Sequence, residues 1–195
     1  MANMTFTGVS CSFEVTIKRR FDRGGRLTPE VVIRAYSIGI FPMASHRSDP
    51  TVHWVAPAMR GILPLDEFHV PRRLRRTLRA GGGGFEVRID SAFASVIDAC
   101  AEPRPGHPET WINDNIAQVF GELHKMGLAH SVDTWPNGEL VGGLYGLALG
   151  GAFFGESMFS FTTDASKFAL VHLVAMLRQG GFVLLDFQFV TDHLR

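Results

Sequence analysis

The sequence predicts an α+β fold, in which a small N-terminal region is followed by a mixed β-sheet with flanking helices. The 195 residues are 46% hydrophobic, which suffices for a sizeable buried core. Capped amphipathic segments and short apolar segments alternate along the chain, so helices and strands are mixed. The C-terminal half reads strand, strand, strand, helix, strand, and its last strand–helix–strand unit is expected to be a right-handed crossover between parallel strands.

The N-terminal region is expected to cover residues 1–65, and its first 26 residues are expected to be irregular. The first firm helix covers residues 28–38. Thr28 suits its N-cap, Pro29 suits its first turn, and Gly39 ends it. The segments expected to be extended are 40–42, 52–55 and 61–65.

The second region covers residues 66–195. Its predicted strands are 85–89, 130–135, 139–147, 152–157 and 182–189. Its predicted helices are one from Pro71 to Ala80, one capped by Asp90 or Ser91, one capped by Asn113, one from Asp164 to Gln179, and a last one capped by Thr191. The four-glycine run at 81–84 is expected to be a surface linker.

Composition excludes several classes of protein. Lys plus Arg number 19 and Asp plus Glu number 19, so a wholly basic nucleic-acid coat is excluded, although a local basic patch is not. Cys11 and Cys100 are too few for a disulfide scaffold and are expected to be reduced thiols. The longest uncharged stretch has 16 residues, six of them Gly, so no membrane segment is expected. The first twenty residues lack the basic-then-apolar pattern of a secretory signal peptide, so we expect a cytoplasmic location.

The helix from Pro71 to Ala80 has an unusual charge distribution. At about 100° per residue its five arginines cover an arc of about 160°, while Leu74 and Leu78 lie on the opposite side. The arginines are Arg72, Arg73, Arg75, Arg76 and Arg79. A solvated charged face is the alternative, but the helix carries no acid. We therefore favour phosphate binding, as a single contact with nucleic acid.

Polar residues interrupt two apolar segments of the C-terminal half. Asp186 and Gln188 are two apart on a strand, so they are expected to share one face. A buried Asp is costly unless it is paired, so either a structural polar pair or a functional site is expected there. Glu156 lies near the end of the neighbouring parallel strand, where ligands tend to bind. The Phe and Met residues around Glu156 would form an apolar pocket with one acidic group.

Other chemistry finds no support in the sequence. None of the eight His has metal-ligand spacing, and no Gly-x-Ser-x-Gly motif occurs. The turn at 160–164 contains no Gly, and Asp164 would repel a pyrophosphate. We therefore expect neither a metal nor a cofactor.

Seven short motifs occur in a fixed order along the chain. They are Gly39-Ile40-Phe41-Pro42, Glu109-Thr110-Trp111-Ile112, His130-Ser131-Val132, residues 139–146, Phe154-Gly155-Glu156-Ser157-Met158-Phe159-Ser160, Ala165-Ser166-Lys167 and Asp186-Phe187-Gln188. With them, the chain resembles the leucyl/phenylalanyl-tRNA–protein transferase family over residues 28–195. The Gly-Glu-Ser-Met-Phe-Ser motif is the most specific of the set.

The resemblance implies an activity and a fold. The family moves Leu or Phe from its aminoacyl-tRNA to a protein whose N-terminal residue is Arg or Lys, which creates an N-degron. The resemblance implies a GNAT-type acyltransferase domain over residues 66–195 that uses no acyl-CoA and no cofactor. The expected partners are Leu-tRNA, Phe-tRNA and acceptor proteins, and we expect a monomer.

The resemblance also implies roles for particular residues. Asp186 and Gln188 match the positions that serve peptide-bond formation, and Glu156 matches the position beside the acceptor. Trp111 matches a tryptophan near the terminal adenosine. The expected substrate-binding residues are Glu156, Trp54, Trp111, Phe153, Met158 and Leu170. The expected tRNA-binding residues are the five arginines of the 71–80 helix.

Two alternatives remain open. The family pattern continues after residues 192–194, whereas this chain stops at Arg195, so a truncated domain is expected. Such a chain would be a tRNA-binding remnant without transfer activity. The other alternative is an acyltransferase that uses acyl-CoA, which the Gly-poor turn at 160–164 disfavours.

Overall fold

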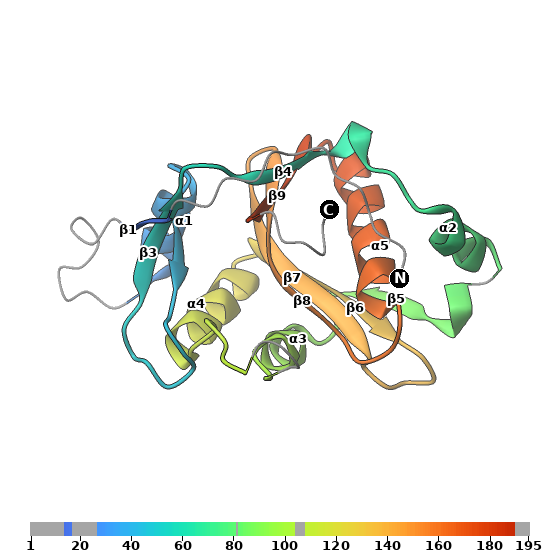
Figure 1. Ribbon diagram of the computed structural model, residues 1–195, viewed down its shortest axis with the longest axis horizontal. Coiled ribbons are helices and arrows are strands. Elements are labelled where there is room, and N and C mark those ends of the chain that lie inside the picture. Colours follow the sequence, from blue (N-terminus) through green and yellow to red (C-terminus); the bar gives the residue numbers. More distant parts are fainter. Residues whose placement is uncertain (1–13, 17–26, 81, 104–107, 190–195) are drawn as a thin grey trace.

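A computed structural model of the chain describes residues 14–16, 27–80, 82–103 and 108–189 (Figure 1). The α-helices are α1 (Pro29–Tyr36), α2 (Arg72–Arg79), α3 (Phe93–Cys100), α4 (Asp114–Lys125) and α5 (Ala165–Gln179). The strands are β1 (Glu14–Thr16), β2 (Phe41–Met43), β3 (His53–Pro57), β4 (Gly61–Pro64), β5 (Glu86–Ile89), β6 (Ala129–Trp135), β7 (Gly142–Leu149), β8 (Ala152–Ser160) and β9 (Leu184–Gln188). Two 3-10 turns, η1 (Leu65–Glu67) and η2 (Gly82–Gly84), flank α2.

The strands form two sheets. The smaller has the order β1-β3-β2, and the larger has the order β4-β9-β8-β7-β6-β5. The larger sheet is antiparallel apart from the parallel pair β8–β9. Helix α5 covers one face of it, and α3 and α4 cover the other (Figure 1). The predicted mixed sheet with flanking helices is therefore confirmed.

Helix α1 begins as its sequence predicts. The hydroxyl of Thr28 accepts a hydrogen bond from the backbone N–H of Val31 at 3.5 Å, and Pro29 occupies the first turn. Gly39 follows the helix with φ at +79°, a conformation that favours glycine. Helix α1 buries its apolar face in a first core cluster, which also takes in side chains of β2, β3, α3 and α4.

Some local expectations need correction. Residues 14–16 form β1, although the first 26 residues were expected to be irregular. Neither Asp90 nor Ser91 caps α3, because the N-cap position is Ala92. Asp90 instead accepts hydrogen bonds from the backbone N–H of Ser131 and from the ring of His130, both at 2.8 Å, so the neighbouring strand satisfies its carboxylate.

The 164–179 helix has the predicted bounds but not the predicted cap. Asp164 occupies the N-cap position of α5 with φ at +68°, and its side chain makes no capping hydrogen bond. Its carboxylate is held by Lys167 and Arg73 instead. The helix expected after Thr191 lies outside the described residues.

The crossover β8–α5–β9 has the predicted parallel arrangement. The two strands pair only from Ala152 to Phe154 and from Leu184 to Asp186. Beyond these pairs β8 runs on to Ser160 and β9 runs on to Gln188 without pairing to each other. On its other side β9 pairs with β4, a strand that lies within the predicted N-terminal region, residues 1–65. The point where β8 and β9 cease to pair is thus bordered by both parts of the chain.

Candidate active site

Three buried polar side chains meet where β8 and β9 cease to pair. Glu156 comes from β8, and Asp186 and Gln188 come from β9. They are only 8%, 5% and 4% exposed. The side-chain amide of Gln188 donates a hydrogen bond to Oε1 of Glu156 at 2.9 Å. The two strands are therefore joined by side chains just beyond the point where their backbones stop pairing.

A local distortion of β9 sets the position of Gln188. Its φ is +64°, and the register with β4 shifts, so that Gly61 faces Gln188 whereas Ile62 faces Asp186. The backbone N–H of Gln188 donates to Oδ1 of Asp186 at 2.7 Å. A left-handed conformation is unfavourable for a residue with a side chain, and strain of this kind is common at functional sites.

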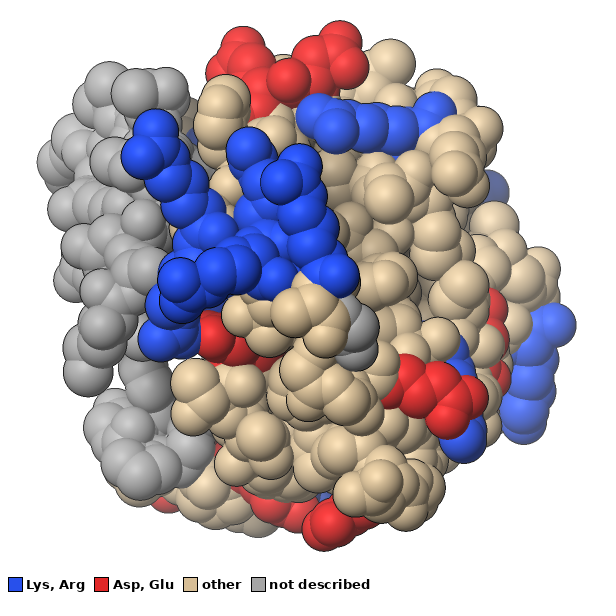
Figure 2. All heavy atoms as spheres, turned by 90° about the vertical axis from the view of Figure 1, so that its right-hand side faces the viewer, with Lys and Arg blue, Asp and Glu red and all other residues tan. Residues whose placement is uncertain are grey.

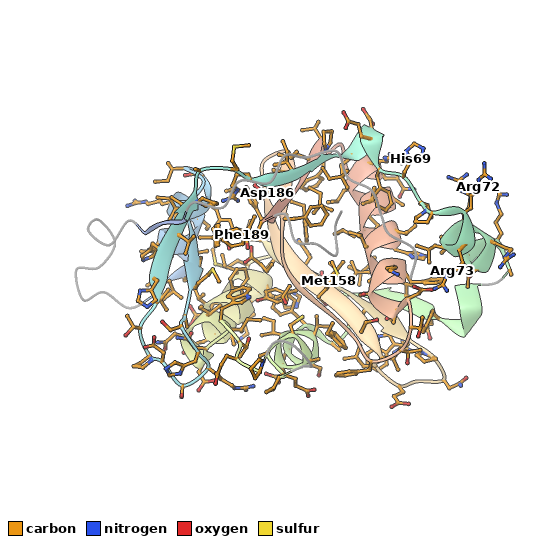
Figure 3. All side chains as sticks on the ribbon, viewed as in Figure 1. His69, Arg72, Arg73, Met158, Asp186 and Phe189 are labelled. Atoms are coloured by element: carbon orange, nitrogen blue, oxygen red, sulfur yellow. The ribbon has the colours of Figure 1, made fainter. Side chains whose placement is uncertain are left out.

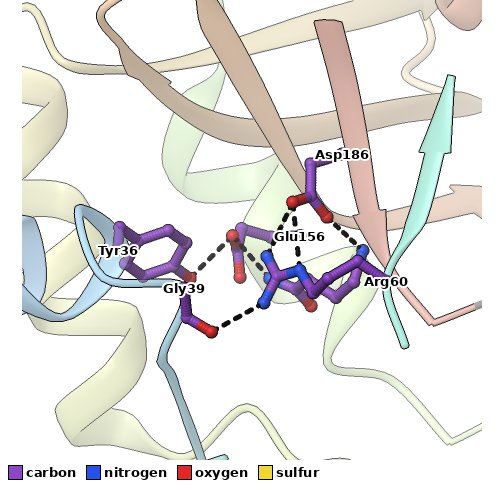
Figure 4. Close-up of polar contacts among 6 residues, drawn as sticks. Tyr36, Gly39, Arg60, Glu156 and Asp186 are labelled. Atoms are coloured by element: carbon purple, nitrogen blue, oxygen red, sulfur yellow. Dashed lines mark hydrogen bonds and ion pairs between the residues drawn. The ribbon is translucent and has the colours of Figure 1, made fainter. Parts of the chain in front are cut away.

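Arg60 holds the other oxygen of Asp186. Its Nε and Nη2 donate to Oδ2 at 3.1 and 2.8 Å, and its Nη1 donates to the carbonyl oxygen of Gly39 at 3.0 Å (Figure 4). The guanidinium lies over the ring of Phe41, 5.1 Å from its centroid. Both oxygens of Asp186 are thus occupied, one by the β9 backbone and one by Arg60.

Tyr36 reaches the same network from the end of α1. Its hydroxyl donates to Oε1 of Glu156 at 2.7 Å (Figure 4). Burial raises the pKa of Glu156 to about 7, against the opposing effect of the hydrogen bonds from Tyr36 and Gln188. Burial and the nearby Glu156 also raise the pKa of Tyr36 well above its usual value. The Oε2 atom of Glu156 is buried and has no hydrogen-bond partner among the described residues.

Helix α2, which carries the five arginines, lies away from the network of Glu156, Asp186 and Gln188 (Figure 3). All five arginines are exposed and gather on one face, while Leu74 is buried and Leu78 is partly buried (Figure 2). Arg73, however, forms an ion pair with Asp164, which Lys167 also contacts at 2.9 Å. An acid from another element therefore neutralises one of the five arginines. Figure 3 shows Arg72 and Arg73 on the opposite side of α5 from Asp186.

Among the residues that the structure describes, no group of three or more His, Cys, Asp or Glu side chains could hold a metal ion. None of the helices in the same ranges is long and apolar enough to cross a membrane.

Comparison with known sequences identifies the family. Residues 62–195 match the profile described as leucyl/phenylalanyl-tRNA protein transferase, and residues 25–58 match the profile of its N-terminal domain. The chain belongs to this family. It is accordingly an aminoacyltransferase. The predicted boundary between residues 65 and 66 stays a prediction, and β4 lies just after the end of the N-terminal profile.

Individual relatives of this transferase agree with the profile. The leucyl/phenylalanyl-tRNA–protein transferase of Paramagnetospirillum magneticum is 61% identical over 169 residues, which cover 87% of this chain and 80% of the relative. The transferase of Nitrobacter winogradskyi is 58% identical, and the match covers 87% of this chain and 74% of the relative. The crystal structure of FemX has a TM-score of 0.54 at 13% identity, covering 92% of this chain and 63% of that one, and it shows a shared fold only.

The other expected site residues of the transferase fall into two core clusters. Trp54 is buried in the first cluster, which also holds Tyr36, and Trp111 packs against it. Phe153 and Leu170 are buried in a second cluster against α5, and Met158 packs against that one. The structure therefore places the two tryptophans in the core cluster that contains Tyr36, and the expected pocket residues in the core cluster on α5.

Sequence reasoning missed Tyr36 and Arg60. Tyr36 occupies the apolar face of a predicted helix, a position typical of a core residue. Arg60 is a single arginine between two short strands. Tyr36 contacts Glu156, which is 120 positions later in the chain, and Arg60 contacts Asp186, which is 126 positions later. No local sequence pattern can connect partners so far apart.

Proposed function

We propose that this aminoacyltransferase moves Leu or Phe from its tRNA to proteins whose N-terminal residue is Arg or Lys. The observation that carries the proposal is the buried network of Glu156, Gln188 and Asp186, located where two parallel strands cease to pair. We further propose a GNAT-type domain that works without acyl-CoA, in a cytoplasmic and monomeric enzyme.

The reaction is aminolysis of an ester. The α-amine of the acceptor attacks the carbonyl carbon of the aminoacyl ester, and a C–N bond forms while the C–O bond to the ribose breaks. The amine loses a proton and the ribose hydroxyl gains one. Because a free α-amine has a pKa of about 7.7–8.0, about a tenth to a sixth of it is already neutral at pH 7. Positioning therefore supplies most of the rate.

The hydrogen bonds suggest a division of roles. Gln188 uses its amide N–H toward Glu156, so its carbonyl oxygen is the atom that aligns the attacking amine. Asp186 has both oxygens occupied and fixes the backbone of Gln188. Glu156 has a pKa of about 7, and its Oε2 atom has no hydrogen-bond partner among the described residues. It is therefore suited to attract the acceptor's ammonium group and to take up its proton.

Binding of the tRNA and of its amino acid is assigned to other residues. The exposed arginines of α2 bind the phosphates of the acceptor stem. Trp54 and Trp111 bind the terminal adenosine, and Phe153, Met158 and Leu170 line the pocket for the Leu or Phe side chain. An apolar pocket excludes charged donors because a buried charge would be left unpaired.

The decisive experiment is transfer of labelled Phe from Phe-tRNA to a peptide that begins with Arg. The same peptide beginning with Glu serves as the control, and Asp-tRNA replaces Phe-tRNA to test the pocket. We expect transfer only from Phe-tRNA to the Arg-starting peptide. Binding of Phe-tRNA without transfer would instead support the tRNA-binding remnant, and acyl-CoA-dependent acylation would support the other alternative.

A further inference from the structure

Arg60 belongs to neither sheet, but it contacts both. It lies in the short segment between β3 and β4, and its side chain is 19% exposed. It contacts the β9 carboxylate of Asp186 through two nitrogens and the carbonyl of Gly39 through the third. Gly39 ends the turn after α1, whose Tyr36 hydrogen-bonds Glu156. Both carboxylates of the site are thus held by residues N-terminal to β4.

A guanidinium is well suited to this position. Its planar set of five N–H groups can serve a carboxylate and a carbonyl at once, which the single ammonium of Lys cannot do in the same geometry. A guanidinium also interacts favourably with the face of an aromatic ring, and that of Arg60 lies over the ring of Phe41. A buried carboxylate that lacks a counter-ion would be costly, so the ion pair with Arg60 compensates the carboxylate of Asp186 and fixes its position.

We infer that Arg60 is a positioning residue of the transfer reaction, which acts through Asp186 to hold Gln188 in its left-handed conformation. Oδ2 of Asp186 is fixed by Arg60, so Oδ1 is directed at the backbone N–H of Gln188. The Gln188 amide then points at Glu156. This inference rests on the proposed function, since it assigns Arg60 to the same network.

The test compares Arg60→Met, Arg60→Lys, Asp186→Asn and the Arg60→Met/Asp186→Asn double variant. The measurement is single-turnover Phe transfer to an Arg-starting peptide at saturating Phe-tRNA, together with the Kd for Phe-tRNA. Arg88→Met is the matched control, because Arg88 also forms two hydrogen bonds to a carboxylate, that of Glu86, and lies 4.8 Å over the ring of Trp135.

We expect Arg60→Met to slow transfer at least about tenfold, while the Kd changes less than about twofold. Arg60→Lys should be intermediate, because it keeps the charge but loses the planar geometry. The double variant should be at most about twofold slower than Asp186→Asn, because the effects of two residues that act through one another do not add. Arg88→Met should transfer at the parent's rate.

Two results would overturn the inference on its own: a parent-like rate in Arg60→Met, or a double variant whose loss multiplies the two single losses. If Arg60→Met is unfolded at the assay temperature, Arg60→Lys alone and combined with Asp186→Asn gives the same comparison. A parent chain that binds Phe-tRNA and transfers nothing would overturn the proposed function, and this inference with it.

Discussion

Two arginine–aspartate ion pairs, Arg60–Asp186 and Arg73–Asp164, join distant parts of this chain in very different surroundings. The side chains of the first pair are 19% and 7% exposed, and those of the second are 52% and 15% exposed. Water and salt screen an exposed pair, which contributes about 0–1 kcal/mol to stability. Removing one partner of a buried pair costs about 3–5 kcal/mol, because the other charge is left uncompensated.

The comparison teaches which arginines serve affinity and which serve geometry. The exposed helix α2 presents positive charge to solvent, where long-range attraction to a polyanion acts and depends on salt. The buried Arg60 has its donors committed to Asp186 and Gly39 and fixes their positions. Changes at the buried pair should therefore affect the transfer step, and changes on α2 should affect binding.

The largest effect is expected for Asp186→Asn. It removes the charge that Arg60 neutralises, so it should slow single-turnover transfer at least about tenfold, or about 1.4 kcal/mol. It should also lower the free energy of unfolding by up to about 3–5 kcal/mol. The Kd for Phe-tRNA should barely change. A parent-like transfer rate would show that the pair is only structural.

The next largest effect concerns Glu156 and pH. The pKa of Glu156 is raised from its ordinary 4.5 to about 7. The folded state therefore holds the carboxyl proton of Glu156 more tightly than the unfolded state does. The protonated carboxyl contributes to the free energy of unfolding below about pH 4.5, and this contribution is lost as pH rises through about 7. The full loss in the free energy of unfolding is about 3 kcal/mol.

Glu156→Gln should remove this contribution to the pH dependence of unfolding. Urea unfolding at pH 5 and pH 8 would reveal it, and an unchanged difference between these pH values would contradict the raised pKa.

A smaller effect is expected when α2 loses arginines. Changing Arg72, Arg73 and Arg76 to Ala should weaken tRNA binding and flatten its salt dependence by roughly 0.7–0.9 log unit per lost phosphate contact. Among the single variants, Arg73→Ala should change the slope least, because Asp164 already neutralises that arginine. Binding measured from 50 to 200 mM salt tests this. A triple variant with the parent's slope would refute the assignment of α2.

The smallest effect is expected for Asp164→Asn. It releases Arg73 for phosphate contact, so the salt dependence of tRNA binding should steepen by less than about one log unit. Stability should change by about 1 kcal/mol or less, because the pair is partly exposed. Asp66→Asn, at an exposed acid, controls for the change in net charge. A loss of tRNA affinity in Asp164→Asn alone would mean that the ion pair is needed to hold α2 in place.

Much of the fold follows from local sequence. The caps of α1 and α4 are Thr28 and Asn113, as predicted, because a side-chain oxygen beside the first turn satisfies a free backbone N–H wherever the helix lies. The apolar positions of α4 face the core for the same local reason, the helical period. Burial of Asp186 and Gln188 was also predictable, because both interrupt an apolar strand.

The contacts of the charged groups could be decided only by the tertiary structure. Asp90 and Asp164 have the residue type of helix caps, yet their carboxylates are bound by groups that packing brings near them. Tyr36 and Arg60 show no local signal of a role, and they complete the site because α1 and the segment before β4 pack against the end of β9. Helical and strand periods arise from interactions over a few residues, whereas a buried charge must find its partner in space, wherever that partner lies in the chain.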